Sequence, residues 1–62
     1  MKKLINDIKI FDPQNPAVQI HFQWVFDDES RMYQFYKDDQ LINSISDSQE
    51  AETFWNGLVK KD

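Results

Sequence analysis

Apolar and polar residues alternate most regularly in the segment AVQIHFQWVF, residues 17–26. Its even-numbered positions carry four large apolar side chains, Ile20, Phe22, Trp24 and Phe26. The positions between them carry Gln19, His21, Gln23 and Val25. A repeat of two residues is typical of a β-strand that buries one face. We therefore predict a strand over Val18–Phe26 whose aromatic face lies in the core.

Three other segments have the length and the β-branched or aromatic content of strands. They are Leu4–Phe11, Arg31–Lys37 and Leu41–Ile45. Polar, turn-forming residues separate the segments, and we expect turns at Asp12–Pro16, Asp27–Ser30 and Asp38–Gln40. Two alternatives stay open: Leu4–Phe11 also fits one short helix, and Leu41–Ile45 could be only an extended lead into the C-terminal segment.

The last part of the chain has helical periodicity. Apolar side chains at positions i, i+3, i+4, i+7 and i+8 are Ala51, Phe54, Trp55, Leu58 and Val59. This spacing places all five side chains on one stripe of a helix. Gly57 falls off the stripe, and it marks either early fraying or a close contact.

Residues at both ends of this segment support a helix. Ser46, Asp47 and Ser48 are all good N-caps, and Ser46–Gln49 and Asp47–Glu50 both have capping-box spacing. Acidic side chains near the start and basic side chains near the end also favour the helix dipole. These are Glu50, Glu52, Lys60 and Lys61.

These elements predict a single domain of the α+β class, a three- or four-stranded antiparallel meander followed by one C-terminal helix packed on one face. The helix stripe should cover the aromatic face of residues 18–26. No second helix is left for the opposite face. We expect that face to present the residues between the aromatic positions, joined by Ile5, Phe11, Met32 and Tyr36 from other strands.

Composition supports a folded chain with a rich core, because 40% of the 62 residues are hydrophobic and 15% are aromatic. Cysteine is absent, which excludes disulfides and thiolate metal sites. The start, MKKLINDIK, is basic but lacks the apolar run of a signal peptide. No stretch approaches a membrane span. We expect a soluble, cytoplasmic protein.

The net charge and the lack of catalytic residue patterns argue against two classes of function, nucleic-acid binding and catalysis. Eleven acidic residues against seven basic ones give a net charge of −4, which argues against direct binding to nucleic acid. His21 is the only histidine, and no nucleophile accompanies it in a recognisable pattern. We therefore expect no metal, no cofactor and no enzymatic activity. An enzyme built on His21 and carboxylates is the weakest alternative.

The favoured function is binding through the face that the helix leaves bare, or through a sheet edge. Aromatic, Met and Arg side chains are enriched at protein interfaces. The candidate residues are Tyr36, Met32, His21, Gln23 and Phe11, with Arg31 at the edge. The partner is another protein or a second copy of this chain, which would make a structural homodimer.

A second candidate surface is acidic. Alternate loops of a meander lie at the same end, so six carboxylates should gather at one pole: Asp27, Asp28, Glu29, Asp47, Glu50 and Glu52. Lys2 and Lys3 should lie near this pole and partly offset its charge. Such a pole could imitate the phosphates of DNA, as phage- or plasmid-type inhibitors do. We call these six residues the acidic pole.

Overall fold

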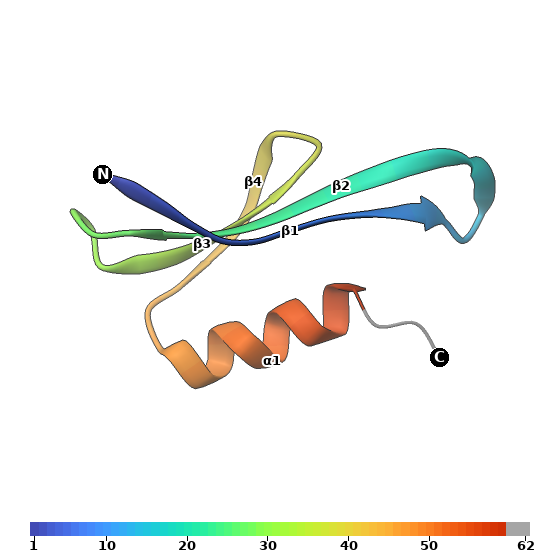
Figure 1. Ribbon diagram of the computed structural model, residues 1–62. Helices are drawn as coiled ribbons and strands as arrows, with labels where there is room; N and C mark the ends of the chain where they lie inside the picture. The colour runs from blue at the N-terminus through green and yellow to red at the C-terminus, as the bar shows by residue number, and fades with distance from the viewer. Residues whose placement is uncertain (60–62) are drawn as a thin grey trace.

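The computed structural model describes residues 1–59 and has four antiparallel strands in one open sheet, followed by one helix (Figure 1). The elements are β1 Lys2–Asp12, β2 Asn15–Asp27, β3 Met32–Lys37, β4 Gln40–Ile45 and α1 Ser48–Val59. The sheet order is β1-β2-β3-β4. The α+β meander is thus confirmed, and Leu41–Ile45 does form a strand. Lys60 and Lys61 lie outside the described residues.

Tight turns join the last three strands. Asp38 and Asp39 connect β3 to β4 with φ angles of 49° and 69°. Positive φ at both central residues is the signature of a type I′ turn, whose twist matches that of the flanking strands. Gln40 therefore belongs to β4 and not to the turn. Arg31, with a φ of 58°, lies in the turn before β3, so its assignment to a strand was wrong.

The β1–β2 hairpin is longer than the sequence predicts. The turn was expected over Asp12–Pro16, yet β2 begins at Asn15 and includes Pro16. Phe11 pairs with Gln19 while Asp12 pairs with Asn15, so residues 16–18 have no counterpart on β1. Because a bulge removes the need for a ladder hydrogen bond, proline is tolerated there. Figure 1 shows this hairpin reaching well beyond the end of α1.

A second irregularity interrupts β1. Leu4 pairs with Val25 and Asn6 pairs with Trp24, which leaves Ile5 in a bulge. Strict alternation groups Leu4 with Ile8 and Ile10. The bulge instead turns Leu4 to the face of Val25, because directly paired residues share a face.

The core lies between the sheet and α1. Its buried members are Phe22, Phe35, Ala51 and Trp55. The half-buried side chains packed against them are Ile8, Ile10, Ile20, Trp24, Tyr33, Ile45, Phe54, Leu58 and Val59. The whole predicted helix stripe therefore takes part in the core, as does most of the predicted face of β2.

Phe35 is the centre of this core, and its exposed fraction is 0%. Its ring centroid lies 4.8 Å from that of Phe54 in an edge contact and 5.9 Å from that of Trp24 in a stacked one. Phe26 is the exception among the predicted core residues, because it packs on Tyr33 at 4.9 Å and is absent from the central cluster.

The start of α1 is capped by one specific residue. The backbone N–H of Glu50 donates to Oδ2 of Asp47 at 2.9 Å, so Asp47 is the N-cap among the three candidates. Glu50 lies in the first turn, whereas Glu52 follows that turn. Gly57 lies inside the helix, and a Cβ there would meet nothing within 4 Å. The predicted close contact at Gly57 was therefore wrong. Within residues 1–59, α1 is too short and too polar to cross a membrane.

Candidate binding face on the open side of the sheet

The sheet face opposite α1 is called the open face below. Starting from His21, Gln23 and Val25, the register identifies its members on the other strands. One row across the four strands is Asp7, Gln23, Tyr36 and Leu41, and the next is Leu4, Val25, Gln34 and Ser44. Lys9 pairs with His21, Phe11 with Gln19, and Met32 with Asp27. Five of the six predicted binding residues therefore lie on the open face, and Arg31 lies in the adjoining turn.

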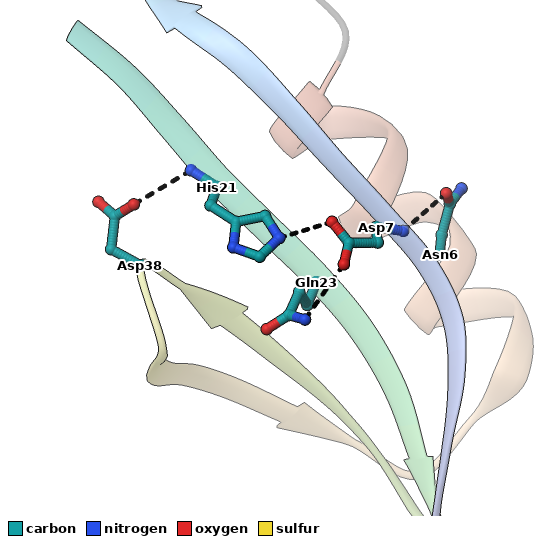
Figure 2. Close-up of polar contacts among 5 residues, drawn as sticks. All are labelled: Asn6, Asp7, His21, Gln23 and Asp38. Carbon is teal, nitrogen blue, oxygen red and sulfur yellow. Dashed lines mark hydrogen bonds and ion pairs between the residues drawn. The ribbon is translucent and has the colours of Figure 1, made fainter.

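A hydrogen-bonded cluster occupies the middle of this face (Figure 2). The His21 Nε2–H donates to Asp7 Oδ1 at 2.5 Å, and the Gln23 side-chain amide donates to Asp7 Oδ2 at 3.2 Å. The bond from His21, then that from Gln23, holds the pKa of Asp7 below its usual range. His21 is half-buried, and its hydrogen bond to Asp7 fixes the orientation of its ring.

Asp7 is the centre of this cluster. Both oxygens of Asp7 already accept hydrogen bonds, and no nucleophile is bonded to His21. Within the part of the chain that the structure describes, no three His, Cys, Asp or Glu side chains gather as metal ligands. The cluster ties β1 to β2 through two side-chain hydrogen bonds.

Asp38 fixes the other side of His21. The Asp38 backbone N–H donates to the His21 carbonyl at 2.8 Å, and the His21 N–H donates to Asp38 Oδ1 at 3.1 Å. Figure 2 shows Asp38 and Asp7 on opposite sides of His21. The tip of the β3–β4 hairpin is thus hydrogen-bonded to the backbone of β2.

Tyr36 lies beside this cluster and is half-buried. Its hydroxyl accepts a hydrogen bond from Lys2 Nζ at 2.8 Å and donates to Gln34 Oε1 at 3.2 Å. The Lys2 ammonium lies 5.4 Å from the ring centroid, beyond the hydroxyl end of the ring, so it contacts the oxygen and not the ring face. The hydrogen bond to Tyr36 raises the pKa of Lys2. One edge of the tyrosine is therefore covered by a cation.

Exposed apolar side chains flank the polar cluster. Phe11, Leu4 and Leu41 expose 62%, 57% and 53% of their surface. Phe11 was a sequence candidate, whereas Leu4 and Leu41 were not. Leu4 lies beside the bulge at Ile5 in β1. Leu41 pairs with Tyr36, where the pairing of β3 with β4 is also irregular. Alternation alone does not reveal such residues, because a bulge moves a side chain to the other face.

The first half of the acidic pole lies at the β2–β3 turn, with cations beside it. The Met1 ammonium lies 2.8 Å from Asp28 Oδ1 and 3.9 Å from Glu29 Oε2. The Asp27 carboxylate accepts the Glu29 N–H, and this bond, with the charge of Lys2, lowers the pKa of Asp27. Lys3 borders the same hollow as Asp28, so both predicted lysines do lie near this end.

The second half of the acidic pole lies at the start of α1. Asp47 caps the helix, and a shallow hollow there is bordered by Asp47, Gln49, Glu50, Thr53 and Phe54. The β2–β3 turn and the start of α1 both lie on the left of Figure 1. Within residues 1–59, Asp28 borders one hollow, and Asp47 and Glu50 border another.

Comparisons with protein-family models, with curated proteins and with solved structures give no match for this chain.

Proposed function

We propose that this chain is a small, non-enzymatic protein-binding module that docks a partner protein on its open face. The proposal rests on one observation: two kinds of group lie together on the open face. Leu4, Phe11 and Leu41 expose apolar surface there, and the hydrogen-bonded cluster around Asp7 supplies fixed polar atoms. Exposed apolar side chains near oriented hydrogen-bonding groups are typical of protein interfaces.

The charges on the open face favour a protein over a nucleic acid as the partner. Lys9 is a cation on this face, but Asp7 lies on the same strand, and the cation of Lys2 is bonded to Tyr36. Binding to a phosphate backbone needs clustered, unpaired cations. A net charge of −4 opposes it further.

The experiment is an affinity pull-down from nuclease-treated lysate at low salt and at about 0.5 M salt, where exposed charge pairs are largely screened. Wild-type chain and Tyr36→Ala serve as baits. The proposal expects a partner that stays bound at high salt and is lost with Tyr36→Ala. A partner that leaves at high salt and ignores Tyr36 would contradict it.

The acidic pole supports an alternative function, imitation of the charge of DNA by a phage- or plasmid-type inhibitor. The observation in its favour is the run of three carboxylates at the β2–β3 turn, where Asp28 and Glu29 are exposed next to Asp27. The nearby cations of Met1 and Lys2 weaken that charge pattern. Under this alternative, the double variant Asp28→Asn/Glu29→Gln loses the partner, whereas Tyr36→Ala retains it.

A further inference from the structure

β1 is an edge strand of eleven residues, because the sheet order places only β2 beside it. Along its outer side, the structure of residues 1–59 pairs no further strand with it. An exposed edge of this length is a template for another strand. Natural edges are commonly protected by charged side chains, and β1 carries Asp7 and Lys9 in its middle. The arrangement of these two charges identifies the strand that would fit.

β1 pairs regularly with β2 from Asn6 to Phe11. Over this stretch Asp7 and Lys9 face the open side, whereas Ile8 and Ile10 face the core side. If two copies of β1 pair antiparallel about a twofold axis, opposed residues must share a face. The axis must then pass through a residue position and not between two positions.

The axis can pass through any of the six positions from Asn6 to Phe11, and those nearest the two charges are Asp7, Ile8 and Lys9. An axis at Asp7 opposes two aspartates, and an axis at Lys9 opposes two lysines. Like charges directly opposite each other are destabilising. An axis at Ile8 opposes Asp7 of each copy with Lys9 of the other, which makes two opposite-charge pairs. The charges that would repel an unrelated strand therefore suit a second copy of the same strand.

We propose that two copies of this chain pair antiparallel along β1 in the register centred on Ile8. The product is a continuous eight-stranded sheet with both helices on the same face. This inference is independent of the proposed docking on the open face, because an edge-to-edge dimer leaves the open faces uncovered.

Packing on the core side supports the same register. Ile8 and Ile10 are only half-buried, because α1 contacts the sheet mainly at β3 and β4. A second copy would oppose Ile8 with its own Ile8 and would place Ile10 opposite Asn6. The dimer thus removes from water apolar surface that a single copy leaves exposed.

The first test is the mass of the full chain in solution, measured by sedimentation equilibrium up to about 1 mM, the weak end of specific association. The dimer predicts a rise from 7.5 kDa to twice that value with concentration. A constant mass of 7.5 kDa over the whole range would overturn the proposal.

The register is tested by cysteine cross-linking, since the natural chain has no cysteine. Directly opposed residues have Cα atoms about 4.5–5.5 Å apart, which suits a disulfide. Oxidised Ile8→Cys should form a covalent dimer, and the matched control Asn6→Cys should not. Asn6→Cys mixed with Ile10→Cys should again cross-link. Efficient self-linking of Asn6→Cys would exclude the Ile8 register.

Charge variants test the pairing without a cross-link. Lys9→Asp alone and Asp7→Lys alone oppose like charges, so each should lose the dimer mass. An equal mixture of the two restores both opposite-charge pairs and should regain it. Lys9→Asp alters an exposed side chain without a hydrogen bond in the described structure, so it should fold normally. Full dimerisation of Lys9→Asp alone would contradict the proposal.

Discussion

The two faces of this sheet are built from the same strands but organised differently. On β3, Phe35 points into the core and is enclosed by the rings of Trp24, Phe54 and Trp55. The next residue, Tyr36, points to the open face and bonds only to polar partners. The difference shows that aromatic content alone does not identify a core. The core face stabilises the fold by burial, whereas the open face leaves apolar side chains in water beside fixed polar atoms.

The largest effect should come from emptying the centre of the core face. Phe35→Ala should cost about 3–5 kcal/mol of unfolding free energy, as deletion of a buried Phe commonly does. Total stability is about 5–15 kcal/mol for typical domains and low for small ones, so this variant should be largely unfolded. Urea unfolding followed by circular dichroism measures it. The control Phe11→Ala, on the open face, should stay within about 0.5 kcal/mol of wild type. Equal losses would contradict the division between the faces.

A smaller loss should follow when the helix over the core face loses its cap. Asp47→Ala removes the acceptor for the Glu50 N–H and should cost about 1 kcal/mol in the same urea experiment. Asp47→Asn keeps an acceptor oxygen and should retain most of that stability. If Asp47→Ala left the unfolding free energy unchanged, the cap would not be holding the helix in place.

The same helix should also accept a stabilising change. Gly57→Ala should raise the unfolding free energy by up to about 1 kcal/mol, because alanine loses less backbone entropy in a helix. The added methyl group meets nothing within 4 Å, so no clash opposes the gain. The midpoint of urea unfolding should move upward, and a downward movement would contradict the open surroundings of Gly57.

The smallest effect should come from the polar cluster of the open face. The folded-state pKa of Asp7 is lowered, so the unfolded chain binds more protons at acidic pH. The carboxylate therefore contributes stability above about pH 4, the usual unfolded value, and loses it as pH falls through the folded pKa. Asp7→Asn lacks this dependence. Unfolding at pH 6 and pH 3 should show a gap between the two proteins that narrows in acid, and a gap that widens would contradict this reasoning.

Alternation and helical spacing predicted β2, β3 and α1 outright, because both depend directly on which side chains leave water. They left open whether residues 4–11 form a strand or a short helix, and whether residues 41–45 form a strand. They placed Phe22 and Trp55 in the core, and they placed Tyr36 and Phe11 on the open face. They failed where pairing is irregular, as at Leu4 and Leu41. They could not foresee the bond between His21 and Asp7, because it depends on the register of two strands and not on the pattern of either.

The central claim, that the open face is the docking surface, is tested most directly by two exposed residues on the long hairpin. Phe11 and Val18 are 62% and 46% exposed, and neither packs against the core. Phe11 pairs with Gln19 on the open face, whereas Val18 lies among residues 16–18, which have no counterpart on β1. Partner capture at about 0.5 M salt should be lost with Phe11→Ser and kept with Val18→Ser, since charge screening leaves apolar contacts intact. Retention with Phe11→Ser together with loss with Val18→Ser would contradict the account.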